Sequence, residues 1–143
     1  MKTTELTKEG IAAAASAILE NEPFVMLNLV RYKEQADYGD RTDFGPCTGR
    51  EAYYGRYVPA FAKVAALSGN DKAFKPVFLG SVLATLVGPV DESWDDVVLV
   101  EYGNLAAFRT VVESPEYERD AAPHRRAGVE NWRFIAMHKQ ALG

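Results

Sequence analysis

The last third of the chain, from Trp94 to Met137, places the tightest constraint on the fold. The apolar run at 96–102 predicts a strand, and Asn104 is a good N-cap for the helical pattern that follows it. The Ser-Pro-Glu-Tyr sequence at 114–117 predicts a second helix start, because serine caps helices well and proline fits the first helical position. The residues at 131–138 then predict a closing strand. This segment is therefore expected to fold as strand, two helical pieces, strand.

The first half of the chain has a similar order of elements. Residues 24–32 form a β-type run that is apolar on both faces, which indicates that both faces are covered. Thr48 and Glu51 have the spacing of a capping box and predict a helix start. A second strand is predicted at 77–87, and the apolar spacing at 6–19 predicts a helix ahead of the first strand.

After the N-terminal helix, the predicted order is β-α-β-β-α-β, the ferredoxin-like arrangement of the α+β class. A four-stranded sheet with helices on one face leaves its other face uncovered. Two alternating sets of strand residues compete for that face, and the set that we expect there includes Met26, Val30, Leu99 and Phe134. Either set is too apolar for water. Two copies that pack these faces together would form a dimeric α+β barrel, so the pattern predicts a homodimer.

Length and composition narrow the class of protein. A chain of 143 residues is typical of one domain, so we treat residues 1–143 as a single domain. The net charge of −4 argues against nucleic acid, because a nucleic-acid binder presents a basic face. No apolar run approaches the ~20 residues of a membrane span, and the first residues lack the pattern of a signal peptide. The single cysteine, Cys47, cannot form an intramolecular disulfide. We therefore expect a cytoplasmic protein with neither a nucleic-acid nor a membrane partner.

Several short motifs, taken in order, resemble the uncharacterised DUF1330 family. They are VMLNLVRY at 25–32, GREAYYGRY at 49–57, Trp94-Asp95, VVLVEY at 97–102, SPEY at 114–117 and RRAGVEN at 125–131. The resemblance implies a dimeric α+β barrel, and it brings no catalytic residues with it. One more residue than in the family pattern separates Tyr117 from Arg125, so the pattern leaves open which residue of the His124-Arg125-Arg126 cluster faces a pocket.

Polar residues inside the strands are candidates for ligand contacts. Asn28 lies in the middle of an apolar strand, where its amide must find a partner or cost about 1–3 kcal/mol. That partner is either a ligand or a neighbouring strand, Ser81 or Thr85. Arg31 and Glu101 lie near strand ends, where they either clamp a substrate or pair with each other.

A second group of candidates lies on the helices. Tyr53 and Tyr57 are one helical turn apart and are candidate ligand-binding residues, with ordinary core packing as the alternative. His124 and Arg125 follow Pro123, which interrupts the second helical piece. There His124 is a candidate general base and Arg125 a candidate anion contact, and the alternative is a solvated basic turn.

We expect Asn28, Tyr53, Tyr57, His124 and Arg125 to line one cleft, with the long loop at 33–47 as its cover. Two histidines and one cysteine without ligand spacing predict no metal site, and the chain has no glycine-rich phosphate loop, so no cofactor is predicted. The sequence thus predicts a protein that binds an unidentified small anionic or partly apolar molecule, and it leaves open whether the protein is also a cofactor-free enzyme. The alternative is a structural or interaction homodimer with a packed interior.

Overall fold

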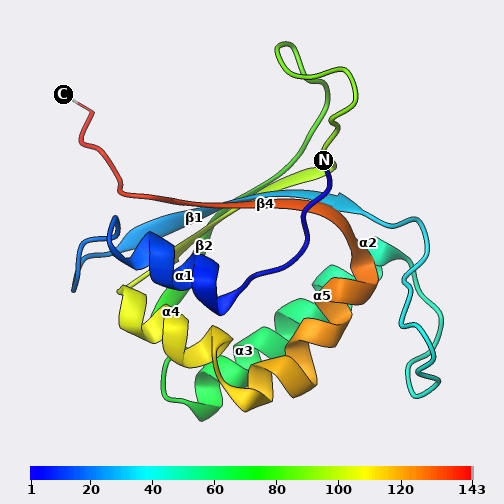
Figure 1. Cartoon of the computed structure of the whole chain (residues 1–143), viewed down its shortest axis with the longest axis horizontal. Coiled ribbons are helices and arrows are strands. Elements are labelled where there is room, and N and C mark those ends of the chain that lie inside the picture. The colour runs from blue at the N-terminus through cyan, green and yellow to red at the C-terminus, as the bar shows by residue number, and fades with distance from the viewer. Residues whose placement is uncertain (143) are drawn as a thin grey trace.

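The computed structural model describes residues 1–142 as one antiparallel sheet with its helices on one side (Figure 1). The strands lie in the order β2-β3-β1-β4, with bounds Phe24–Tyr32 for β1, Phe74–Ser81 for β2, Asp96–Tyr102 for β3 and Val129–Met137 for β4. The α-helices are α1 (Lys8–Ala15), α2 (Gly49–Glu51), α3 (Val58–Leu67), α4 (Leu105–Val112) and α5 (Ala122–Gly128). Two π-helical turns, η1 (Ala52–Tyr57) and η2 (Tyr117–Ala121), precede α3 and α5. The predicted α+β class is confirmed, and the elements after α1 follow one another as a strand, helices, two strands, helices and a last strand.

The helix after β1 begins at the predicted capping box. Thr48 Oγ1 accepts a hydrogen bond from the Glu51 amide at 3.1 Å, and Glu51 Oε1 accepts one from the Thr48 amide at 3.1 Å. Further along, the helix widens into η1, where the Val58 N–H donates to the carbonyl of Tyr53 five residues earlier. Pro59 then lies in the first turn of α3, directly after the π-helical turn.

The predicted second strand was placed wrongly. It was expected at 77–87, but β2 starts at Phe74 and ends at Ser81. Ser81 is paired with Asp96, the first residue of β3, so the partner strand ends there and cannot pair with the residues that follow. Residues 82–95 instead leave the sheet on the face opposite the helices (Figure 1). This segment, which we call the arm, carries side chains that are at least 94% exposed: Leu83, Leu86, Val87 and Val90.

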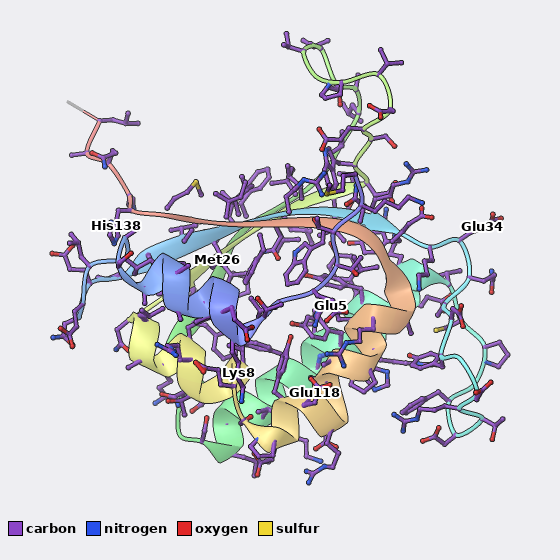
Figure 2. The ribbon with its side chains drawn as sticks, in the orientation of Figure 1. Glu5, Lys8, Met26, Glu34, Glu118 and His138 are labelled. Carbon is purple, nitrogen blue, oxygen red and sulfur yellow. The ribbon has the colours of Figure 1, made fainter. Side chains whose placement is uncertain are left out.

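The faces of the sheet follow strict alternation along β1. Its buried positions, which include Met26 and Val30, point toward the helices, as Figure 2 shows for Met26. Phe134 is paired with Asn28 and lies on that same side, so the set expected on the uncovered face was wrong except for Leu99. The uncovered face carries the alternate set, and one row of it crosses all four strands as Phe78, Leu99, Leu27 and Ile135.

The backbones of α2 and α5 lie so close together where they cross that a side chain does not fit at Gly49. A Cβ atom on Gly49 would lie 2.1 Å from the carbonyl oxygen of Lys33 and 2.5 Å from that of Gly128. The Gly49 amide donates to the Lys33 carbonyl at 3.1 Å, and the Lys33 amide donates to the Gly128 carbonyl at 2.8 Å. Three segments are therefore held together at this point by backbone hydrogen bonds that require glycine. Within residues 1–142, no helix is both long and apolar enough to cross a membrane.

Candidate functional site

A cavity of about 260 Å³ lies between the sheet and the helices. Strands β1 to β4 form one wall, and η1, α3, α4 and η2 form the other. We call it the tyrosine cavity because its aromatic lining includes Tyr53, Tyr54, Tyr57, Tyr102, Tyr117 and Trp132. Among the predicted residues, Asn28, Tyr53 and Tyr57 all line it.

The two π-helical turns place four of these tyrosines. Tyr53, Tyr54 and Tyr57 belong to η1, and Tyr117 belongs to η2. The rings of Tyr53 and Tyr57 are stacked with centroids 5.3 Å apart. The Tyr57 and Tyr117 hydroxyls lie 2.9 Å from each other and join the two turns. Single π-turns are rare and often mark functional sites, so their presence on both sides of one cavity supports it as the candidate site.

Two tyrosine hydroxyl groups in the lining have no hydrogen-bond partner in the protein. Within the described residues, neither Tyr53 nor Tyr102 has a hydrogen-bond partner for its hydroxyl. Among the side-chain oxygen and nitrogen atoms of residues 1–142, only Asp96 Oδ1 is both fully buried and without a hydrogen-bond partner. The two tyrosine hydroxyls also lack a partner, so they are not fully buried, and both rings line the cavity. Burial raises the pKa of Tyr53 and of Tyr102. Both groups therefore stay protonated at neutral pH and offer hydrogen-bond donors to a molecule in the cavity.

Asn28 lies at the floor of the cavity, but its amide is used within the sheet. Nδ2 donates to the Val98 carbonyl at 3.2 Å, and Oδ1 accepts from the Trp132 indole nitrogen at 2.9 Å. Of the two predicted roles for the Asn28 amide, a ligand contact and a hydrogen bond to a neighbouring strand, the structure contains the hydrogen bond. Asn28 thus fixes the position of Trp132, whose ring lines the cavity.

Arg125 lies directly behind the cavity wall. Its side chain is 1% exposed, its guanidinium lies 4.9 Å from the centre of the Trp132 ring, and Nε is 3.4 Å from the Tyr117 hydroxyl. Nη1 donates to the carbonyl of Thr4. Within residues 1–142 it forms no ion pair, and its hydrogen bonds go to neutral groups, the Tyr117 hydroxyl and the Thr4 carbonyl. Such a charge is costly without an anion, and it creates a positive potential behind Tyr117 and Trp132.

His124 lies elsewhere, which corrects the prediction of one shared cleft. Its ring is buried under the loop at 33–47, against Phe44, and its Nδ1 is 2.8 Å from the Tyr38 hydroxyl. Arg56 donates to that same hydroxyl at 3.1 Å. Burial and then the charges of Arg56 and Arg41 lower the pKa of His124. The loop therefore covers His124 and not the tyrosine cavity. The direction of the His124 ring depends on contacts with residues that lie far from it in sequence.

Arg31 and Glu101 do not pair with each other. Glu101 is opposite Val25 at one end of β1, and Arg31 lies at the other end, about 20 Å away along the strand. Arg31 Nε is 3.3 Å from a carboxylate oxygen of Glu130 instead. Both side chains are on the face of the sheet away from the helices, so neither reaches the tyrosine cavity.

The sequence reasoning missed Asp96. Its carboxylate is 1% exposed, and Oδ2 accepts hydrogen bonds from Tyr32 and Tyr54, each at 2.8 Å, and from Arg50 at 2.6 Å. Burial raises the pKa of the Asp96 carboxyl, but the hydrogen bonds from the two phenols and the charge of Arg50 outweigh burial and hold it below its usual value. Burial, together with the hydrogen bond to Asp96 and its negative charge, raises the pKa of Tyr54 to about 12. An acidic residue that opens an apolar strand was the available signal, and it was read only as a strand boundary.

Two crystal structures match nearly the whole chain. The RPA0582 protein of unknown function from Rhodopseudomonas palustris is 35% identical, with a TM-score of 0.80, and the match covers 99% of this chain and 100% of that one. The chain belongs to the RPA0582 family. A methylated form of RPA0582 is 34% identical, with a TM-score of 0.79 and coverage of 99% and 98%. A dimeric ferredoxin-like protein of unknown function from Bacteroides fragilis NCTC 9343 is 14% identical at a TM-score of 0.42, over 85% of this chain and 100% of that one, and has no bearing on the argument.

The match with RPA0582 spans both π-helical turns and the residues that line the tyrosine cavity, because it leaves out only 1% of this chain. No family model matches the chain, so the likeness to DUF1330 stays a resemblance. No curated protein matches it either. Within residues 1–142, no cluster of three or more histidine, cysteine, aspartate or glutamate side chains is arranged to hold a metal ion.

Proposed function

We propose that this protein binds a small, mainly apolar molecule in the tyrosine cavity, through hydrogen-bond acceptors such as a carboxylate or a carbonyl. The observation that carries the proposal is the pair of unpartnered hydroxyls of Tyr53 and Tyr102 on a mainly apolar wall of aromatic and aliphatic side chains. A volume of about 260 Å³ is near the lower end of the range for ligand pockets, ~300–1,000 Å³. The cavity therefore suits a molecule about the size of a substituted benzene ring.

The charge of Arg125 favours an anionic ligand. The guanidinium is buried against Trp132 and Tyr117, both of which line the cavity. A carboxylate on the other side of these rings would be attracted in an environment of low dielectric constant. Its oxygens would accept hydrogen bonds from the two protonated phenols.

Binding fits this site better than catalysis. The titratable groups that line the tyrosine cavity are tyrosines, whereas His124 and Asp96 lie outside it. A general base works best with a pKa near the working pH, and burial moves the pKa values of Tyr53, Tyr57 and Tyr102 away from neutrality. The presence of the cavity also argues against the alternative function, a structural or interaction homodimer with a packed interior.

Calorimetric titration with benzoate, phenylacetate and 3-phenylpropionate tests the proposal. Each missing hydrogen bond is worth about 1 kcal/mol, so Tyr53→Phe and Tyr102→Phe should each weaken binding by about fivefold to tenfold. Val98→Phe should fill the cavity floor and abolish binding. The matched control is Tyr38→Phe, which removes a phenol outside the cavity and should leave affinity unchanged. Equal affinity in all four variants, or no binding of any of the three acids, would reject the proposal.

We also infer a homodimer that forms through the uncovered face of the sheet. The row Phe78, Leu99, Leu27 and Ile135 is a continuous apolar strip, and the arm extends beyond that same face (Figure 1). A second copy would cover the strip and give the exposed leucines and valines of the arm an apolar surface, as in a dimeric α+β barrel.

The mass in solution tests the homodimer. Light scattering should give about twice the 15.8 kDa of one chain at micromolar concentration. Leu27→Asp should return the mass to that of one chain, because it places a charge in the centre of the strip. Leu67→Asp changes a 70% exposed leucine at the end of α3, on the helical side, and should stay dimeric. A monomer for the unmodified chain contradicts this part of the proposal and leaves ligand binding untouched.

A further inference from the structure

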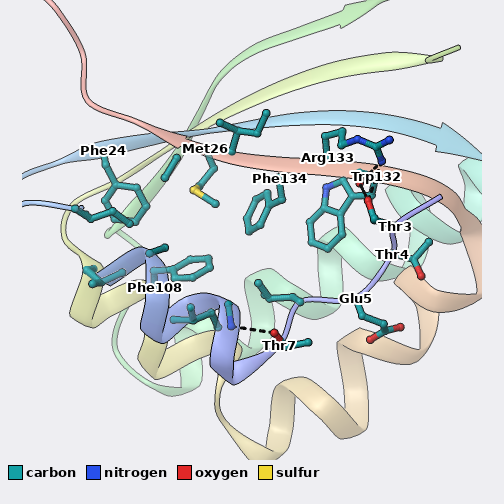
Figure 3. Close-up of a pocket in the computed structure, with 18 residues that line it drawn as sticks. Thr3, Thr4, Glu5, Thr7, Phe24, Met26, Phe108, Trp132, Arg133 and Phe134 are labelled. Atoms are coloured by element: carbon teal, nitrogen blue, oxygen red, sulfur yellow. Dashed lines mark hydrogen bonds between the residues drawn. The ribbon is translucent and has the colours of Figure 1, made fainter. Parts of the chain in front are cut away.

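A second cavity lies on the other side of Trp132 and Phe134 (Figure 3). Its volume is about 360 Å³, and it is enclosed by residues 3–7, α1, β1, β4 and α4. We call it the N-terminal cavity. Its deeper wall is apolar and includes Ile11, Ile18, Phe24, Met26 and Ala136. The lining carries no phenol, and its polar side chains belong to the N-terminal segment and β4: Thr3, Thr4, Glu5, Thr7 and Arg133.

The two cavities share four wall residues: Leu6, Phe108, Trp132 and Phe134. Phe108 belongs to α4, and Trp132 and Phe134 belong to β4, so three of the four are fixed on regular elements. Leu6 comes from the extended segment ahead of α1. Its half-buried side chain packs against both hydrophobic clusters of the core. We call the four shared residues the partition between the cavities.

The segment that carries Leu6 is held on β4 by backbone and side-chain hydrogen bonds of residues 1–3. The Trp132 amide donates to the Thr3 carbonyl at 2.7 Å, and the Thr3 amide donates to Asn131 Oδ1 at 2.9 Å. Thr4 is tied to Arg125 through its carbonyl. Leu6 follows this tether and precedes the N-cap Thr7, so it is the one side chain of the partition that lies on neither a helix nor a strand.

We propose that the two cavities are halves of one site for an elongated amphipathic anion, with Leu6 as the passage between them. The inference rests on the proposed function. An aromatic acid head would lie in the tyrosine cavity, near Tyr53, Tyr102 and the charge of Arg125. An alkyl tail on the ring would pass Leu6 and lie against the apolar wall of the N-terminal cavity. The preferred ligand is therefore an arylalkyl or acyl-type carboxylate and not a compact aromatic acid.

A series of 4-alkylbenzoates from methyl to octyl, with benzoate as the reference, tests this by calorimetric titration. Each methylene that enters the N-terminal cavity should raise affinity about threefold to fourfold. Ala14→Trp on α1 fills that cavity without touching the tyrosine cavity, because Ala14 lines only the former. It should remove the gain from chain length and leave benzoate affinity within twofold. Ala13→Trp places the same ring one residue earlier, outside both linings, and should behave as the unmodified chain.

Leu6→Ala supplies a second, independent measurement. A wider passage should raise the affinity for the hexyl and octyl compounds by at least threefold relative to the affinity for benzoate, which the same substitution can change because Leu6 also lines the tyrosine cavity. If benzoate binds but affinity stays flat beyond the ethyl compound, or Ala14→Trp and Ala13→Trp behave alike, the continuous site is refuted while the proposed function stands. If no member of the series binds, both are refuted.

Discussion

The hydroxyl of Tyr57 lies 2.9 Å from the hydroxyl of Tyr117, and this contact joins the two π-helical turns across the tyrosine cavity. Tyr117 also accepts a hydrogen bond from Arg125 Nε at 3.4 Å. Since that bond occupies an oxygen lone pair, the proton of Tyr117 is available for Tyr57. The buried guanidinium of Arg125 is thus linked to the cavity wall through the hydroxyl of Tyr117 and then that of Tyr57.

This connection predicts unequal effects of removing the two hydroxyls. Tyr57→Phe removes one hydrogen bond and should lower the free energy of unfolding by about 1 kcal/mol. Tyr117→Phe removes that bond and also one of the few partners of a buried guanidinium, so it should cost about 2–3 kcal/mol. Urea denaturation of both variants checks the order. Equal losses would mean that Tyr117 does not stabilise Arg125.

Asp96 should make a pH-dependent contribution to stability. Its folded pKa is held below the unfolded value of about 3.9, so the contribution is complete above about pH 4 and is lost as the pH falls through the folded pKa. Asp96→Asn should lower the free energy of unfolding by about 2 kcal/mol at pH 7, because hydrogen bonds to a charged acceptor are the stronger ones. The difference from the unmodified chain should shrink between pH 4 and pH 3. A constant difference over that range would contradict the assignment.

The parts of the fold that depend on neighbours in sequence were predictable. The capping box at Thr48 and Glu51 and the alternation of β1 are local patterns, and both are present. The end of β2 was not predictable in this way, since it is set by Asp96, the residue with which Ser81 pairs. The apolar residues of the arm form a pattern that is also typical of a strand, although they have no partner strand within residues 1–142.

The candidate site was predictable to a similar extent. Asn28 stood out because an amide in an apolar strand is costly, and Tyr53 and Tyr57 because helical spacing put them together. The environment of Asp96 was not visible, since its partners Tyr32, Arg50 and Tyr54 come from three elements, β1, α2 and η1, that lie far from it in sequence. Sequence spacing identifies which residues lie on one face of one element, but it does not show which elements meet.

Acid should destabilise the protein through His124. Burial and the charges of Arg56 and Arg41 depress its folded pKa below the unfolded value of about 6.5, so at mildly acidic pH the unfolded chain binds a proton that the folded chain does not. The free energy of unfolding should therefore fall as the pH drops from about 6.5 through the folded pKa. His124→Gln should reduce this fall between pH 7.5 and pH 5. NMR titration of the imidazole gives a direct check, and a pKa at or above 6.5 would disprove the prediction.

Gly49 should tolerate no side chain. A methyl group there would lie 2.1 Å from the carbonyl oxygen of Lys33 and 2.5 Å from that of Gly128, and backbone atoms on two segments would have to separate. The separation would weaken the hydrogen bonds that hold Lys33 between α2 and α5, so Gly49→Ala should cost more than about 3 kcal/mol. Gly55→Ala is the matched control in η1, because nothing lies within 4 Å of its added methyl group. That variant should be neutral or stabilise the protein by about 0.5–1 kcal/mol, since alanine loses less conformational entropy than glycine on folding. Thermal denaturation of the two variants decides the matter, and similar midpoints would show that the crossing of α2 and α5 can open without cost.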